Sequence, residues 1–310
     1  MTTLLLARGR AARLALDPTL AGLLGGLVAA LSWGGYLALM RAGVKSGLAG
    51  PDFLILRFGV AAVLTAPLLV WRWPQVRAIG PGRALALALA AGPLFVLVGS
   101  TGFAFAPLSH GAVVQPATVA VGGLILGTLL LGEAMTARKA LGAGAVIAGV
   151  LLVGGAALTT GEAGAWIGDL LFAAAGGLWL VFTLLLRRWR IDPLAGAAVV
   201  NAISGAVVLP AYLLAVGPDR LAALPPGTLA LQAFVQGVLA GAVAVAAFAV
   251  AVRELGAGRA ALFPALVPAT AVLIGIPVAG EVPGIPQVAG LVLATAGLVL
   301  AVTRGRGGPR

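Results

Sequence analysis

The sequence has no cysteine and very few charged residues. Without cysteine, the chain can form no disulfide bond, and it has no thiol nucleophile and no cysteine metal site. Charged residues make up 9% of the 310 positions, whereas soluble domains carry about 25%. Hydrophobic residues instead account for 61%, and the mean hydropathy is +1.11. We therefore expect most of this protein to lie within a lipid bilayer.

Several motifs of membrane enzymes and pumps are also missing. The sequence contains no Walker A motif, no HExxH and no GxSxG, and it has no pair of carboxylates deep in adjacent apolar segments. ATP is therefore not expected to drive this chain directly, and the alternative of a membrane protease or acyltransferase is weakened. A channel would need symmetry around a pore, or a charged or carbonyl filter, and neither is evident. The sequence indicates no metal site, no cofactor and no obligate protein partner.

The net charge of +11 does not indicate nucleic-acid binding, because the basic residues lie in short turns between apolar segments. A transmembrane helix needs about 20 apolar residues, and turn residues divide the chain into ten such segments. The period-2 alternation of a membrane β-barrel is absent. The sequence therefore predicts an all-α polytopic membrane protein with spans at 19–40, 52–71, 84–106, 109–131, 137–157, 165–187, 193–216, 228–251, 259–279 and 285–303.

The distribution of Lys and Arg predicts the orientation of these spans. Sixteen of the 20 basic residues fall in segments on the side of the N-terminus, and three fall on the other side. Because cytoplasmic loops are rich in Lys and Arg, both termini are expected in the cytoplasm. Residues 1–18 do not resemble a signal peptide, since their arginines follow the short apolar run. We interpret 1–18 and 304–310 as cytoplasmic tails.

The chain contains an internal repeat. Pro116, Gly132-Glu133 and Gly142 recur 148 positions later as Pro264, Gly280-Glu281 and Gly290. This predicts a first unit at 19–157 and a second at 158–303, each with five spans. Because five is odd, the second unit must be inverted in the membrane. Inverted repeats are the plan of many secondary transporters, whose solute site lies near the midplane between the repeats.

The repeated stretches resemble a known family. PATVAVGGLILGTLLLGE, PALVPATAVLIGIPVAGE, LILRF and LGAGRAALFPALVP are similar to paired EamA domains of the drug/metabolite transporter superfamily. The resemblance implies a ten-helix basket whose cavity is lined by spans one to four and six to nine, with spans five and ten outside it. It also implies the bacterial inner membrane. Exporters of amino acids and metabolites, including exporters of aromatic amino acids of the YddG type, are the members it resembles most.

Uncharged side chains supply the first candidates for a solute site. Gln115 is the strongest, because it precedes Pro116, which disturbs the helix at that point. Trp33 and Trp179 are repeat mates too deep for a headgroup belt, so they either pack helices or line the cavity. Ser100, Thr101, Asn201, Gln232, Gln236 and Phe263 complete this group of cavity candidates.

Each charged candidate has two interpretations. Arg57 lies inside the second span, where it either faces a cavity, or reaches the headgroups or pairs with a neighbour in a structural role. His110, the only histidine, is either a proton sensor or the polar start of a helix. Glu133 and Glu281 are expected to cap the helix that follows each of them, with a gating role beside a residue such as Arg138 as the alternative.

The prolines suggest where helices bend. Pro116, Pro264 and Pro268 mark positions in spans four and nine that are either static kinks or hinges. Together with the repeat, these features predict a secondary transporter that exports amino acids or similar small zwitterionic metabolites by alternating access. The alternatives are a polytopic enzyme acting on a lipid or peptide and an exporter of unrelated drugs. Little dependence on a pH gradient is expected, because no buried acidic relay is visible.

Overall fold

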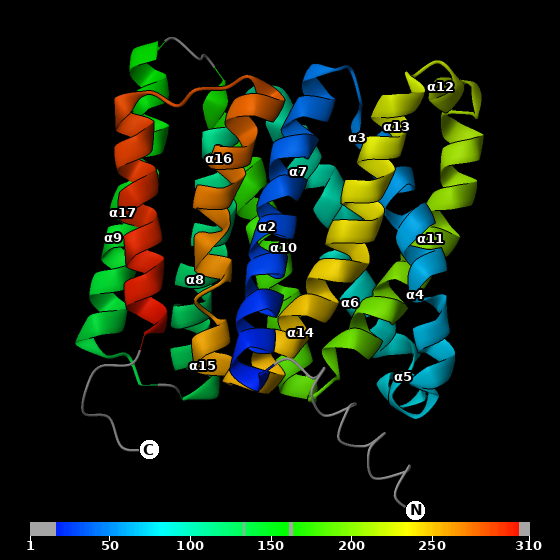
Figure 1. The fold of residues 1–310 in the computed structure, drawn as a ribbon, viewed down its shortest axis with the longest axis horizontal. Coiled ribbons are helices and arrows are strands. Elements are labelled where there is room, and N and C mark those ends of the chain that lie inside the picture. Colours follow the sequence, from blue (N-terminus) through cyan, green and yellow to red (C-terminus); the bar gives the residue numbers. More distant parts are fainter. Residues whose placement is uncertain (1–16, 133, 161–163, 304–310) are drawn as a thin grey trace, which may run out of the picture.

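The computed structural model describes residues 17–132, 134–160 and 164–303. Within these ranges the chain is helical without strands, which confirms the predicted all-α fold. The helices stand side by side in one bundle (Figure 1), and nine of the described helices are long and apolar enough to cross a membrane. Pro264–Ala279 is a further, shorter apolar helix. The predicted tails at 1–18 and 304–310 lie almost entirely outside the described residues.

The spans follow the predicted segments closely. In chain order they are α2 (Pro18–Lys45), α3, η1 and α4 (Gly50–Leu54, Ile55–Gly59, Val60–Trp71), α6 and α7 (Pro81–Ala91, Pro93–Phe105), α8 (Leu108–Leu131), α9 (Ala137–Thr160), α10 (Ala165–Trp189), α11 (Pro193–Ala215), α13, η2 and α14 (Pro226–Gln232, Ala233–Val243, Ala244–Leu255), η3 and α16 (Pro264–Leu266, Val267–Ala279) and α17 (Ile285–Val302). Short helices α5 (Trp73–Ile79), α12 (Asp219–Ala222) and α15 (Ala257–Ala260) lie in the connections.

The helix ends follow from local sequence. Asp17 accepts a hydrogen bond from the backbone N–H of Leu20 at 3.1 Å, and Pro18 occupies the first helical position of α2. At their C-terminal ends, α8 and α16 both stop at a left-handed glycine, Gly132 with φ of 67° and Gly280 with φ of 64°. Only glycine adopts this conformation at little cost. The Gly-Glu element of the repeat is therefore a helix stop used twice.

The ninth span differs from the prediction. The sequence predicts a helix over 259–279, but the regular helix α16 begins only at Val267, after a turn at 261–263 and the short 3-10 helix η3. Pro264 and Pro268 explain this, because proline has no backbone N–H and fixes its own φ, which favours a helix start over a helix interior. The two prolines therefore lie at helix starts, and the chain breaks before them.

Both ends of the described chain lie at the same end of the bundle. In Figure 1, α2 begins and α17 ends at the bottom, together with α5 and α15, whereas α3 and α12 lie at the top. We call the first end the terminal end and the second the opposite end. This arrangement is the one that the predicted cytoplasmic location of both termini requires, and that location stays a prediction.

The two repeats are interleaved. Helix α2 of the first repeat packs mainly against α14 and α16 of the second, while α10 of the second packs against α7 and α8 of the first. The remaining spans pair with their own repeat mates, α4 with α11 and α9 with α17. The packed groups α2–α14–α16 and α7–α8–α10 therefore each contain helices of both repeats. We call them the first and the second helix group.

Helices α9 and α17 form a close antiparallel pair at one edge of the bundle (Figure 1). A Cβ atom on Gly149 would lie 2.6 Å from the backbone oxygen of Gly290, and one on Gly142 would lie 2.7 Å from that of Gly297. The converse contacts, from Gly290 and Gly297, are equally short. Glycines in a membrane helix allow this close approach of backbones. The glycine-rich character of spans five and ten is thus explained by their contact.

Candidate functional site

Arg57 lies in the interior of the bundle. It belongs to the π-helical segment η1, and its side chain is buried. Its guanidinium carbon is 5.0 Å from the centroid of the Tyr36 ring and 5.7 Å from that of Phe58, which are cation–π distances. Its Nε and Nη1 atoms have no hydrogen-bond partner among the described residues. Arg57 is therefore paired with aromatic rings inside the bundle, and its exposure to a cavity stays a prediction.

A chain of buried amides lies in the second π-helical segment, η2, and at the end of α13, which precedes it. Gln232 donates from Nε2 to the backbone oxygen of Leu39 at 2.6 Å, and Gln236 donates from Nε2 to Oε1 of Gln232 at 3.1 Å. The Oε1 atom of Gln236 is buried and accepts no hydrogen bond from the described residues. This amide chain therefore leaves one acceptor unused in the interior.

The segments η1 and η2 lie against each other. A Cβ atom on Gly237, next to Gln236, would touch the side chain of Val60 and the backbone oxygen of Leu56, next to Arg57. π-Helical turns occur frequently at functional sites, since they widen the helix and redirect side chains. We call Arg57, Tyr36, Gln232 and Gln236 the interior site. It offers unpaired hydrogen-bond donors and an unpaired acceptor inside an apolar bundle.

Asn201 connects three spans by hydrogen bonds. Its Nδ2 atom donates to the backbone oxygen of Gly241 at 3.1 Å and contacts Oγ1 of Thr65 at 3.4 Å. These bonds join α11 to η2 and α4. The amide donor is thereby already engaged, in contrast with the free donors of Arg57.

A buried carboxylate that the sequence analysis did not single out, Asp52, lies in α3 at the opposite end of the bundle (Figure 1). Asp52 accepts hydrogen bonds from Tyr212 at 2.9 Å, from Arg220 at 2.9 and 3.3 Å, and from the backbone N–H of Ala49 at 2.8 Å. These contacts tie α3 to α11 and α12. The hydrogen bond to Asp52 raises the pKa of the Arg220 guanidinium above its usual value. At the terminal end, Arg72 and Asp192 form the corresponding link between α4 and α11, at 2.8 Å.

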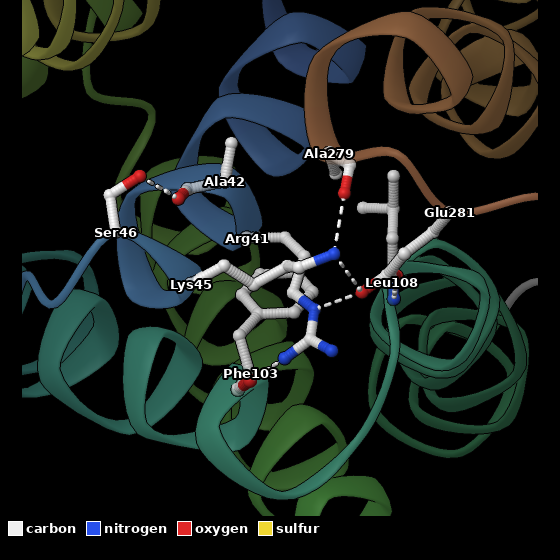
Figure 2. A network of polar contacts seen from close by, with 8 residues as sticks. All are labelled: Arg41, Ala42, Lys45, Ser46, Phe103, Leu108, Ala279 and Glu281. Carbon is white, nitrogen blue, oxygen red and sulfur yellow. Dashed lines mark hydrogen bonds and ion pairs between the residues drawn. The ribbon is translucent and has the colours of Figure 1, made fainter.

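Glu281 is the centre of a polar network at the opposite end of the bundle (Figure 2). Its carboxylate pairs with Arg41 at 2.6 Å, lies 3.8 Å from Nζ of Lys45, and accepts a hydrogen bond from the backbone N–H of Leu108 at 2.8 Å. Arg41 also donates to the backbone oxygen of Phe103, and Lys45 donates to that of Ala279 at 2.6 Å. Glu281 therefore caps α8, not α17, the next helix in the chain.

This network joins the two helix groups. Arg41 belongs to α2 and Glu281 follows the end of α16, whereas Phe103 and Leu108 belong to α7 and α8. A partly open pocket of about 650 Å³ lies over the network, and Arg41, Ser109, Glu281 and Gln287 contribute to its walls. The repeat mate of Glu281, Glu133, lies outside the described residues. Arg138, its suggested gating partner, donates to Thr303 and to the backbone oxygen of Leu300, at 2.7 and 3.3 Å.

Buried His110 pairs with partly exposed Asp169, and the sequence analysis singled out only the histidine. The Nδ1 atom of His110 lies 2.8 Å from Oδ1 of Asp169, and the histidine has no exposed surface. The pair joins α8 to α10, within the second helix group. His110 was a candidate in the sequence, but its acidic partner was missed, because 59 residues separate the two along the chain.

The aromatic candidates pack against other rings. Trp33 lies 5.4 Å from Phe248 between ring centroids, and Trp179 lies 5.2 Å from Phe95 and 5.1 Å from Phe182. Phe263 covers Gly26 of α2, leaving no space for a Cβ atom there. The two tryptophans thus belong to different aromatic clusters.

The remaining polar candidates lie elsewhere on α7 and α8. Gln115 is half-buried. The hydroxyls of Ser100 and Thr101 donate to the backbone oxygen of Leu97, at 3.1 and 2.8 Å, so both hydrogen-bond within their own helix. Pro116 lies within α8, which continues past it. In the described part of the chain, no three His, Asp or Glu side chains gather to hold a metal ion.

Comparison with known proteins adds a family and a fold. The sequence matches the EamA-like transporter family over residues 20–155 and again over residues 166–303. No curated protein matches the sequence. In the comparison with solved structures, twelve chains match. One of them, described only as "Crystal structure of protein", is 19% identical, covers 92% of this chain and 96% of its own, and has a TM-score of 0.60. That similarity shows a shared fold and nothing of the solute.

Proposed function

The chain belongs to the EamA-like transporter family, and from this membership we propose that it is a secondary transporter of amino acids or similar small zwitterionic metabolites. The observation that carries this proposal is the interior site. It holds a buried cation with unpaired donors on η1 and a buried amide with an unpaired acceptor on η2, and these two segments are in contact. A zwitterion has a carboxylate and an ammonium group, and these are the two groups that such a site lacks.

Arg57 is proposed to bind the carboxylate. A guanidinium is a rigid fork of N–H donors that matches a carboxylate. Leaving a buried polar group without a partner costs about 1–3 kcal/mol, and more when it is charged. The unpaired Nε and Nη1 atoms of Arg57 therefore favour an anionic guest. The rings of Tyr36 and Phe58 keep the guanidinium in place.

Gln236 is proposed to receive the ammonium group. Its Oε1 atom is the unpaired acceptor, and its own N–H donor is held by Gln232, which is anchored to Leu39. This chain of bonds fixes which atom of the amide points to the guest. A fixed acceptor selects a donor, so the site should discriminate between an amino acid and the corresponding acid without an amino group.

Alternating access is proposed to occur between the two helix groups, and not between the two sequence repeats. Each group contains helices from both repeats, and these pack closely. At the opposite end, the groups are joined by the hydrogen bonds from Arg41 to Phe103 and from Leu108 to Glu281. Opening toward that side requires both bonds to break. We propose that the termini face the cytoplasm of a bacterial inner membrane, so that opening at this end releases the solute outward.

The orientation can be tested directly, because the chain has no cysteine. Gln75 lies in α5 at the terminal end and Asp219 in α12 at the opposite end, and both are exposed. In intact cells, a membrane-impermeant maleimide should label Asp219→Cys and should label Gln75→Cys only after permeabilisation. The reverse pattern would contradict the proposed orientation.

The function itself is tested by counterflow in proteoliposomes. Liposomes loaded with one unlabelled amino acid should accumulate the same labelled amino acid transiently, with no ion gradient imposed. Phenylalanine should exchange, whereas phenethylamine and 3-phenylpropionate, which each lack one of the two charged groups, should not. If no common amino acid exchanges while the protein turns over a lipid or peptide, the transporter proposal fails and the enzyme alternative is favoured.

A further inference from the structure

The ion pair between Arg41 and Glu281 is open to the pocket at the opposite end. Each of the two side chains keeps 18% of its surface exposed, unlike the buried residues of the interior site. The pocket volume of about 650 Å³ lies within the range of about 300–1,000 Å³ that small-molecule sites occupy. The pair is therefore within reach of a solute from that side.

The same two side chains also make the bonds that join the helix groups there. Arg41 donates both to Glu281 and to the backbone oxygen of Phe103, and Glu281 accepts both from Arg41 and from the backbone N–H of Leu108 (Figure 2). The ion pair holds both residues in position for these contacts. If either charged group changes partner, a bond between the helix groups is released with it.

A zwitterion carries one charged group that can bind Arg41 and one that can bind Glu281. Its carboxylate can take the place of Glu281 on Arg41, and its ammonium group can take the place of Arg41 on Glu281. Each charge keeps a partner during the exchange, so the cost of leaving a charge unpaired is avoided. A solute with only an ammonium group would leave Arg41 without a carboxylate, and one with only a carboxylate would leave Glu281 with Lys45 alone, at 3.8 Å. Lys45 also donates to the backbone oxygen of Ala279, so it is a poorer partner for Glu281 than Arg41 is.

We propose that the pocket over Arg41 and Glu281 is a second binding site for the zwitterionic head group, and that its occupation releases the two helix groups at the opposite end. This proposal rests on the proposed transport of zwitterions and adds a site at which the solute opens its own path. Because only the head group is recognised, small and large amino acids should act alike here, whereas the interior site also meets the side chain.

A cysteine beneath the network reports opening. Ala38 has no exposed surface, and it lies near the contact between Leu108 of α8 and Gly275 of α16, which belong to different helix groups. In the cysteine-free chain, Ala38→Cys is therefore a single reporter of that contact. Its rate of reaction with a small membrane-impermeant thiol reagent should be slow without solute. Asp219→Cys, which is exposed, serves as the control for reagent reactivity.

The expected result separates the two sites. Alanine and phenylalanine should each accelerate labelling of Ala38→Cys several-fold, and phenethylamine and 3-phenylpropionate should not. The acceleration should persist when Arg57→Met disables the interior site. Adding Glu281→Gln, or Arg41→Gln where the first variant folds poorly, should give fast labelling without solute and no further response to it.

The proposal is overturned if neither amino acid accelerates labelling, if the acceleration disappears in Arg57→Met, or if both network variants label as slowly as the parent. Failure of the transport function itself would look different. In that case counterflow would be absent, while the labelling of Ala38→Cys would still respond to amino acids.

Discussion

The α9–α17 pair and the η1–η2 pair each join an element of the first repeat to one of the second, and they differ in almost every other respect. Helices α9 and α17 are regular, and glycines bring their backbones close together. The segments η1 and η2 are π-helical and carry Arg57 and Gln236 with unpaired atoms. The first contact brings backbones together at glycines, whereas the second holds side chains with free donors and acceptors.

The difference separates a scaffold from a site. Close glycine packing gives rigidity because every backbone group is already paired within its own helix. Unpaired buried groups cost stability, and a fold retains them where they have another use. The pair at the edge therefore supports the bundle, while the interior pair is the part that a solute would complete.

The largest effect is expected at Arg57. Arg57→Met keeps much of the side-chain volume but removes the donors, so a bound carboxylate loses hydrogen bonds to a charged group worth about 1.5–3 kcal/mol each. Losing two such bonds should lower counterflow or solute affinity roughly a hundredfold or more. Yield and thermal stability should change little. A variant that transports like the parent would show that the interior cation has no part in binding.

The edge pair should respond in the opposite way, through stability. A Cβ atom at position 149 would lie 2.6 Å from a backbone oxygen, so Gly149→Ala should lower the free energy of unfolding by about 1–3 kcal/mol. The matched control is Gly144→Ala on the same helix, where nothing lies within 4 Å. This control should be neutral or slightly stabilising, since alanine favours helix by about 0.5–1 kcal/mol. Thermal unfolding in detergent measures both, and equal melting temperatures would contradict the close contact.

A smaller contrast is expected between the two acidic residues that link the second and seventh spans. Asp52 is 1% exposed in its ion pair and accepts several hydrogen bonds, whereas Asp192 is 30% exposed. Asp52→Asn should therefore cost about 1–3 kcal/mol of stability. Asp192→Asn should cost less than about 1 kcal/mol, because the pair is solvated and asparagine also caps helices well. Melting temperatures of the two variants should differ in that order, and the reverse order would contradict the assigned burial.

The smallest effect is expected from a pH gradient. The pair of His110 and Asp169 lies within the second helix group, so it does not cross the surface between the groups along which movement is proposed. Counterflow should therefore depend little on an imposed proton gradient, even though the histidine is buried beside a carboxylate. Strict dependence on the gradient that His110→Ala abolishes would show that the pair has a role in coupling.

Features that are local in sequence were predicted well. The order of the spans and the ends of the fourth and ninth spans at 131 and 279 follow from backbone preferences of neighbouring residues. The family resemblance was also confirmed. The helix start at 259 was wrong, because Pro264 and Pro268 act as starts of a later helix and not as kinks within one.

Features that depend on packing between distant segments were not predicted. The partners of Asp52 and His110 lie 160 and 59 residues away, so no spacing rule connects them. The cap formed by Glu281 was assigned to the next helix, whereas the structure gives it to α8. Gln115, Trp33 and Trp179 stay predictions as solute contacts, and their chemistry alone could not show which atoms other side chains already engage.

Equilibrium binding tests the central role of the interior site most directly. The ligand is a labelled amino acid that exchanges in counterflow, and the proteins are the parent chain, Arg57→Met and Gly144→Ala, each purified in detergent. We expect the parent and Gly144→Ala to bind with equal affinity and Arg57→Met to bind roughly a hundredfold more weakly. Equal affinity of Arg57→Met and the parent would contradict the assignment of Arg57 as the carboxylate-binding residue.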